Sequence, residues 1–377
     1  MSDIIKSYDV GSVPFVGEFD KFSKGAINLS SILSLLYGIN HPSYEPIKYF
    51  EEKVIKSFLD KLEAGINIPN YPQFRDMNAM FLDQIEGIKK IGNNYSIIRN
   101  LSVKPNMAKI PEVQAIKRYS RRIYEKIGNP FKIKICITGP YTLSSIFLNR
   151  KSGIFKELSK VLLEFVSNNI HKNKYSEVEL VAIDEPAFGF LSDPLIDYGS
   201  EGREELLKSW EDISHKVVSM GAYSCIHLHN TADDLFWEVN SLNIIESHAE
   251  DSIYESKNTK QFLEKKDKFL KASICITNFD KLIRDKILAE SRAIDEVALM
   301  QRVDKAWTEI NQGIINPNGF LEPIEIMIKR LKKIVGNYGI ERVPYAGPEC
   351  GMKGFPKYES ALECLKRVSN TVKNFSQ

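Results

Sequence analysis

Short apolar runs rich in β-branched residues alternate with longer amphipathic segments along the chain, and this alternation restricts the fold more than any other feature. Eight strands separated by helices predict an α/β protein built as a single (β/α)8 barrel of the TIM type. No linker rich in proline, glycine or serine divides the chain, so we expect residues 1–377 to form one barrel domain. The expected strands are Ser7–Val10, Gly65–Ile68, Phe131–Ile137, Glu179–Ile183, Ala222–His229, Asn243–Glu246, Ala272–Thr277 and Arg342–Ala346.

The helices are expected between these strands, and the clearest is Tyr49–Leu62, whose apolar residues recur every fourth position. Residues 78–112 do not follow the alternation, and we interpret them as an extra helical excursion from the barrel. The other expected helices are Val113–Lys126, Phe155–Lys174, Glu204–Met220, Ala232–Asn240, Lys260–Leu270, Glu296–Asn311, Pro323–Val335 and Lys357–Asn374.

The net charge and the cysteines indicate which binding partners and which cellular compartment to expect. The formal net charge is only +2, from 51 basic and 49 acidic residues, which argues against nucleic acid or a membrane surface as a partner. No run approaches the roughly 18 apolar residues of a membrane span, and Met1–Lys6 lacks the apolar core of a leader peptide. The 5 cysteines form no CxxC pair. We therefore expect a cytoplasmic protein with reduced thiols.

Polar residues follow the expected strands where each strand ends. In a barrel of this type the carboxyl ends of the strands face a common site, so these side chains are expected to meet. A random scatter would not concentrate such residue types at strand ends. They are Ser12, the Tyr71–Asp76 loop, Thr138–Thr142, Asp184, His229, Glu246, Asn278 and Cys350.

Three of these residues offer the ligand types of a catalytic zinc site. His229, Glu246 and Cys350 supply an imidazole, a carboxylate and a thiolate, and catalytic zinc commonly has three protein ligands and one open position. Considered alone, His229 can also be interpreted as a buried structural histidine. Cys350 can likewise be interpreted as a small apolar residue in a turn. Glu246 follows two isoleucines, and a carboxylate buried there would be costly without a partner. Together the three favour a metal site.

The neighbouring histidines and cysteines also have structural as well as functional interpretations. His227 shares a strand face with His229, because side chains alternate, and is either a second ligand or a group that orients one. Cys225 lies deeper on that face and is expected in the core. His248 lies two residues beyond Glu246, past the end of the expected strand, and is interpreted as structural. The cysteines expected in apolar surroundings are Cys136, Cys275 and Cys364.

In these stretches the chain resembles the C-terminal catalytic barrel of cobalamin-independent methionine synthase. It resembles a stand-alone core form without that family's N-terminal barrel. The last three strand-end groups, in the right order, make the resemblance fairly specific, which the glycine and proline matches alone would not. The matching segments are Asp9–Pro14, Ile137–Thr142, Ile183–Ala187, Ile226–His229, Ile245–Ser247 and Pro348–Lys353.

The resemblance implies a zinc-dependent methyltransferase that moves a methyl group to a small-molecule thiol, homocysteine, to give methionine. It implies zinc ligands at His229, Glu246 and Cys350. Asp184 falls on a residue that holds the substrate amino group, and Ser12 on one that contacts the substrate.

The chain departs from the family at the second cysteine ligand, whose position is occupied by Thr231. Either His227 or Thr231 replaces that ligand, a three-ligand site remains, or the metal is lost. Tyr71 replaces a glutamate that contacts the substrate, with Gln73 nearby, and the methyl donor is expected to approach past Tyr141 and Tyr71.

Because the family's N-terminal barrel helps to hold polyglutamyl folate, the expected donor is a methylated corrinoid, a corrinoid protein or another pterin. Three alternatives stay open at this point. The acceptor could be another thiol such as coenzyme M, or the chain could be a metal-free enzyme like uroporphyrinogen decarboxylase. The third is a non-catalytic homologue that binds a thiol or a corrinoid.

Overall fold

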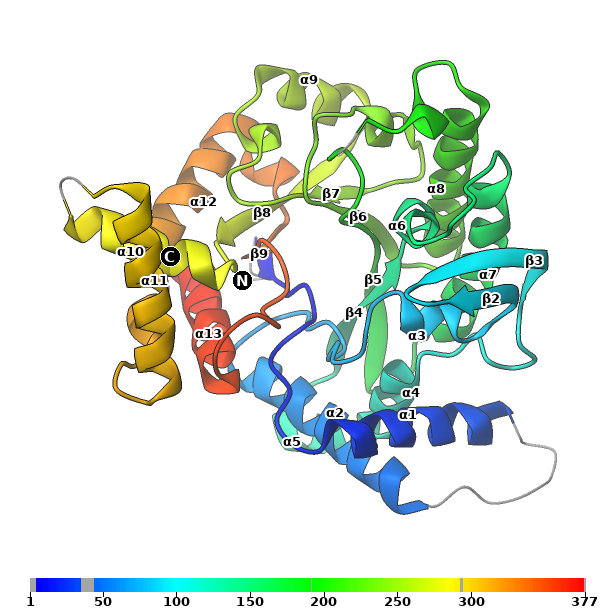
Figure 1. The fold of residues 1–377 in the computed structure, drawn as a ribbon, viewed down its shortest axis with the longest axis horizontal. Helices are drawn as coiled ribbons and strands as arrows, with labels where there is room; N and C mark the ends of the chain where they lie inside the picture. The colour runs from blue at the N-terminus through cyan, green and yellow to red at the C-terminus, as the bar shows by residue number, and fades with distance from the viewer. Residues whose placement is uncertain (1–4, 35–43, 191, 292–293, 376–377) are drawn as a thin grey trace.

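The computed structural model describes residues 5–34, 44–190, 192–291 and 294–375. Residues 1–4, which make up most of the segment expected to lack the features of a leader peptide, lie outside the described residues. A parallel 7-stranded sheet curls around a central axis in the order β1-β9-β8-β7-β6-β5-β4, with helices around it (Figure 1). Its strands are β1 Lys6–Ser7, β4 Phe131–Thr138, β5 Ser176–Glu185, β6 Tyr223–Leu228, β7 Ile244–Glu246, β8 Phe269–Cys275 and β9 Tyr345–Pro348.

An extended segment at residues 66–70 fills the gap between β1 and β4. Parallel bridges join Tyr8 to Ile68 and Asn70 to Lys134, so this segment takes the place of the second barrel strand. Polar side chains replace part of the missing ladder. The Asp9 carboxylate accepts a 2.6 Å hydrogen bond from the backbone amide of Asn70 and another 2.6 Å hydrogen bond from the Lys61 ammonium group. The (β/α)8 barrel expected from the sequence is confirmed, with an irregular closure at this position.

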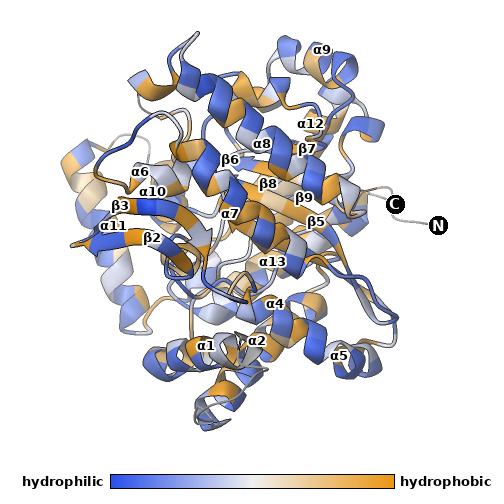
Figure 2. Ribbon diagram, turned by 90° about the vertical axis from the view of Figure 1, so that its right-hand side faces the viewer, coloured by the Kyte–Doolittle hydropathy of each residue, from blue (hydrophilic) through white to orange (hydrophobic). Residues whose placement is uncertain are grey.

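Helices cover the outside of the barrel, and their apolar faces turn toward the strands. In α7, Phe155, Leu158, Leu162 and Phe165 are all buried, and their spacing of three and four residues places them on one face. Figure 2 shows hydrophobic and hydrophilic residues alternating along α7. The helices are α1 Phe19–Ser34, α2 Tyr44–Glu63, α3 Ala79–Leu82, α4 Pro111–Arg118, α5 Ser120–Ile127, α6 Pro140–Ser145, α7 Ile154–Asn169, α8 Glu201–Ser219, α9 Lys257–Lys265, α10 Phe279–Glu290, α11 Glu296–Asn311, α12 Ile324–Tyr338 and α13 Tyr358–Phe375.

The excursion between the second and third barrel strands is present, but the expectation that it is helical was wrong. Apart from the short α3 and the start of α4, residues 78–112 contain an antiparallel hairpin of β2 Ile85–Ile91 and β3 Asn94–Val103, packed beside α7 (Figure 1). Isoleucines at 85, 88 and 91 and at 97 and 98 favour strands, and Gly92 has the positive φ of a tight turn. Gly87, at an irregularity in the pairing, interrupts the alternation that would have indicated a strand.

Three expected helices are shorter in the structure, and the one expected over Phe155–Lys174 ends at Asn169. The helix expected over Val113–Lys126 is divided at Tyr119 into α4 and α5. The segment expected as a helix over Ala232–Asn240 forms only a 3-10 turn at Leu235–Glu238, because Asn230 and Asp233 side chains accept hydrogen bonds from nearby backbone amides. The helix expected to reach Leu270 ends at Lys265, and β8 already begins at Phe269. Among the described residues, no helix is both long and apolar enough to cross a membrane.

Candidate metal centre and active site

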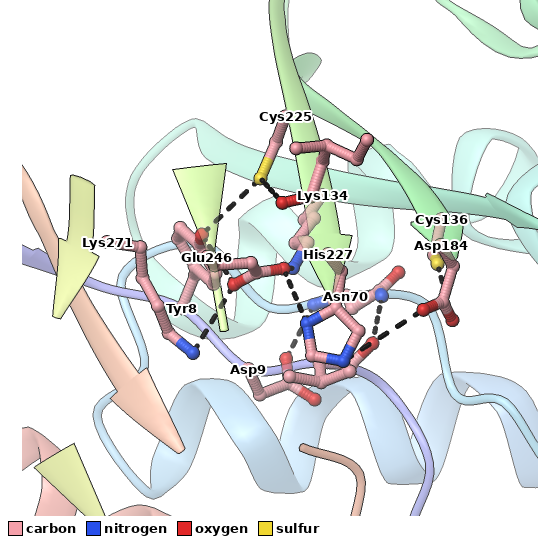
Figure 3. A network of polar contacts seen from close by, with 12 residues as sticks. Tyr8, Asp9, Asn70, Lys134, Cys136, Asp184, Cys225, His227, Glu246 and Lys271 are labelled. Atoms are coloured by element: carbon pink, nitrogen blue, oxygen red, sulfur yellow. Dashed lines mark hydrogen bonds and ion pairs between the residues drawn. The ribbon is translucent and has the colours of Figure 1, made fainter. Parts of the chain in front are cut away.

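A row of polar residues crosses four neighbouring strands near their carboxyl ends. Strand register pairs Thr138 with Asp184, Asp184 with His227, and His227 with Glu246. Paired residues of adjacent parallel strands project to the same side of the sheet. The ladder therefore aligns these side chains side by side, as Figure 3 shows for Asp184, His227 and Glu246.

Above this row, two imidazoles and a thiol form a group with the geometry of a metal site. The possible ligand atoms of His227, His229 and Cys350 all lie within 4.8 Å of one another. The Nε2 atom of His229 is 3.4 Å from the Cys350 sulfur. The ring of His248 packs against that of His229, with centroids 4.1 Å apart, and extends the group.

The turn that carries Cys350 is fixed by residues on the loops that follow three strands, β7, β8 and β1. The Glu349 carboxylate accepts 2.9 Å hydrogen bonds from the amides of Ala249 and Thr277. The Met352 amide donates to the carbonyl of Ser12 at 2.8 Å. A side chain at Gly351 would collide with the Ser12 hydroxyl, so glycine allows this close approach. The thiol is thus presented by a rigid turn.

Charges within the group favour a thiolate beside protonated imidazole when no cation is bound. Burial acts to raise the pKa of Cys350, but contacts with the imidazoles of His227, His229 and His248 hold it well below the usual range. Burial acts to lower the pKa of His227, but Asp184, Cys350 and Glu246 raise it to about 10. A divalent metal ion would replace such protons.

Asp184 faces the group from the end of β5. Its Oδ2 atom accepts a contact from the Cys136 sulfur at 3.4 Å, and its Oδ1 atom has no hydrogen-bond partner among the described residues. That free oxygen lies 3.9 Å from Nε2 of His227. Burial raises the pKa of Asp184, and the nearby His227 opposes the rise. A buried carboxylate with a free oxygen can receive a cationic group of a ligand.

Glu246 was expected beside His229 and Cys350, but its contacts lie one layer deeper. Its carboxylate oxygens contact the ammonium groups of Lys134 at 2.9 Å and Lys271 at 3.3 Å, and it is fully buried. It is not one of the residues grouped around Cys350.

Of the two replacements considered for the missing cysteine, the structure brings His227 into the group and turns Thr231 away. The Thr231 hydroxyl and amide both bind the carboxylate of Asp251. Thr231 therefore fixes the loop after β6.

The residues expected to bind substrate lie in different surroundings. Ser12 adjoins the Cys350 turn through its carbonyl and hydroxyl. Tyr71 is fully buried and donates a 2.8 Å hydrogen bond to the Cys136 carbonyl, while Gln73 lies 3.4 Å from the Tyr71 hydroxyl. Tyr141 is also buried, and its hydroxyl donates to Asp193 at 3.0 Å.

Sequence reasoning missed Lys134 and Lys271, which lie in the barrel interior, and it left His248 outside the site. Both lysines have apolar neighbours on either side in their strands, in Ile133–Lys134–Ile135 and Leu270–Lys271–Ala272. A lysine in such a position must find a buried acidic partner, so these two positions were the available signal. His248 follows the end of β7 by two residues, and that position was its only signal in the sequence. Its Nε2 atom is buried without a hydrogen-bond partner in the described part of the chain.

The chain matches no family model. It is 21% identical over 329 residues to a methionine synthase from Sulfolobus acidocaldarius, covering 86% of this chain and 81% of that protein. A methionine synthase from Sulfurisphaera tokodaii is also 21% identical, over 326 residues that cover 85% of this chain and 81% of that protein. Homology to proteins of this name thus extends over most of the chain.

Solved structures give the same picture of the fold. A B12-independent methionine synthase from Shewanella sp. W3-18-1, in complex with selenomethionine, superimposes with a TM-score of 0.61 at 14% identity, covering 98% of this chain and 97% of that one. A methyltransferase from Methanosarcina mazei gives a TM-score of 0.52 at 11% identity, covering 100% of this chain and 96% of that one.

Proposed function

We propose that this protein is a zinc-dependent methyltransferase that transfers a methyl group to the thiol of homocysteine and so forms methionine. The observation that carries the proposal is the group of His227, His229 and Cys350 at the carboxyl ends of the barrel strands. Similarity to proteins named methionine synthase over most of the chain supports the same reaction class.

The donor set fits a zinc ion. One sulfur and two imidazole nitrogens are ligand types that zinc prefers, and three protein ligands leave one position for a substrate. The Nε2 atom of His227 has no hydrogen-bond partner among the described residues, and its Nδ1 atom faces Glu246 at 3.3 Å, although the side chain is only 1% exposed. Buried nitrogens of this kind are expected to bind something. Zinc bound there would favour the ionised form of a coordinating thiol, which is the nucleophilic form.

Residues of the chain would orient the acceptor. Asp184 offers its free Oδ1 to the substrate ammonium group, and the Ser12 turn beside Cys350 lies where it could position the carboxylate. In the reaction the substrate sulfur loses its proton and forms a bond to the methyl carbon. The bond from that carbon to the donor breaks, and its electron pair stays on the donor. We propose a methylated corrinoid or a pterin other than polyglutamyl folate as that donor.

The function is tested by assaying zinc-loaded protein with two acceptors and two donors. The acceptors are homocysteine and 2-mercaptoethanesulfonate, and the donors are methylcobalamin and a monoglutamyl methyl-pterin. We expect methionine, detected by mass spectrometry, with at least one donor. Transfer only to 2-mercaptoethanesulfonate would exclude homocysteine as acceptor. Full activity of His229→Ala would exclude the scheme, and the exposed His215→Ala in α8 is the control.

Replacing Asp184 by asparagine is expected to weaken use of homocysteine selectively. A hydrogen bond to a charged group contributes about 1.5–3 kcal/mol, so kcat/KM for homocysteine should fall about 10–100-fold, mainly through KM. A thiol without an amino group, such as 3-mercaptopropionate, should lose little. Steady-state kinetics with both acceptors measures the difference. An equal loss for both would show that Asp184 does not recognise the ammonium group.

A further inference from the structure

Both oxygens of the Glu246 carboxylate are already occupied by groups of the protein. On Oε1 lie the Lys134 ammonium at 2.9 Å and the Nδ1 atom of His227 at 3.3 Å. On Oε2 lie the Tyr8 hydroxyl at 2.7 Å and the Lys271 ammonium at 3.3 Å. All five side chains are at most 1% exposed where they meet inside the barrel (Figure 3).

This environment is poorly suited to a metal ligand. Burial acts to raise the pKa of Glu246, but Lys134 and Lys271 hold it well below its usual range, so the carboxylate is ionised. Burial opposes the charge of Lys134 as well, yet Glu246 raises its pKa. If the carboxylate turned to a metal ion, Lys134 would lose its closest anionic partner in a site without water access. Leaving a charge buried and unpaired costs several kcal/mol.

His227 connects this network to the group around Cys350. Its Nδ1 atom is directed to Glu246, and its Nε2 atom lies on the opposite side of the ring, 3.9 Å from Asp184. The two residues are register partners on β6 and β7, so the backbone holds them side by side. Imidazoles that bind metals commonly direct their second nitrogen to a carboxylate, which fixes the tautomer and the ring orientation.

We propose that Glu246 is a positioning residue in this chain and that the zinc ligands are His227, His229 and Cys350. Glu246 holds the proton of His227 on Nδ1 and leaves Nε2 for the metal. Lys134 and Lys271 stabilise the carboxylate in that role. The inference rests on the proposed zinc site and replaces the ligand set that the resemblance implies, in which Glu246 binds the metal and His227 does not.

X-ray absorption at the zinc edge separates the two ligand sets, because imidazole rings give a distinct outer-shell signal. We expect one sulfur at about 2.3 Å and at least two imidazoles at about 2.0–2.1 Å in the wild-type protein. His227→Ala should lose one imidazole, and His215→Ala should lose none. A single imidazole in the wild type would overturn the inference while leaving a zinc methyltransferase intact. Protein that binds no zinc would overturn both.

A charge-conserving double variant tests the positioning role by affinity. Glu246→Gln with Lys134→Met removes one charge of each sign, and Lys271 keeps its contacts with Ser273 and the Pro348 carbonyl. The double variant should still bind about one zinc per chain, about 10–100-fold more weakly in competition with a chelator, as loss of an outer partner generally causes. A folded variant with no zinc would make Glu246 a ligand, and unchanged affinity would exclude its positioning role. If the variant does not fold, the count of imidazoles in the wild type decides.

Discussion

Replacing Cys350 by alanine is expected to remove most of the zinc and to reduce methyl transfer by more than about 100-fold. Loss of an outer partner of a ligand already costs about 10–100-fold, and Cys350 supplies the only sulfur in the group. Elemental analysis of protein purified without chelators would give about one zinc per chain in the wild type and a small fraction in the variant. Circular dichroism would show that the variant is folded.

Cys364→Ala is the matched control for this experiment. Cys364 is a buried thiol on α13, 3.6 Å from the sulfur of Cys275, and it belongs to no group of possible metal ligands in the described ranges. It should keep its zinc and its activity. Equal zinc in Cys350→Ala and wild type would place the metal elsewhere. No zinc in either protein would mean that this chain shares only its fold with the methionine synthases.

Replacing Gly347 by alanine is expected to lower the free energy of unfolding by about 3 kcal/mol or more. A Cβ atom at this position in β9 would lie against the backbone carbonyl oxygen of Tyr8 and 3.2 Å from the Lys271 side chain. Overpacking in a core costs about 1–3 kcal/mol, and the upper end is expected here because a backbone atom cannot rotate away. Urea denaturation measures the change.

Gly336→Ala is the same substitution at a position where it is expected to raise the free energy of unfolding rather than to lower it. Gly336 is exposed within α12, and a Cβ atom there would contact nothing within 4 Å. Alanine is favoured over glycine in a helix interior by about 0.5–1 kcal/mol, so this variant should be slightly more stable than the wild type. Equal effects of the two substitutions would show that the contact with Tyr8 is not what requires glycine at position 347.

The sequence predicted the barrel well because each strand carries its own apolar pattern. The expected Phe131–Ile137 and Glu179–Ile183 lie within β4 and β5, and even the 3-residue β7 was located, because Glu246 marks its end. The hairpin was not foreseen, since Gly87 and an irregular pairing disturb its alternation. Local patterns of this kind reveal elements but do not reveal breaks in register.

The site was predicted in part, and its missing part depends on distant pairings. The sequence alone indicated that Glu246 would be buried and in need of a partner. It could not tell a metal ion from lysines as that partner, since Lys134 lies 112 positions away. His227 could be placed beside His229 by strand parity, whereas only the three-dimensional structure directs Thr231 toward Asp251.

The pairing of β1 with β9 has a consequence for how the protein is made. Lys6 and Ser7 are made well before their ladder partners Tyr345 and Ala346, because most of the barrel lies between them in the sequence. The ladder between β1 and β9 therefore forms only after the whole intervening chain has been made, and until then β1 lacks its β9 partner. Contacts so far apart in sequence slow folding and expose strand edges. Closure of this barrel is therefore expected late in folding.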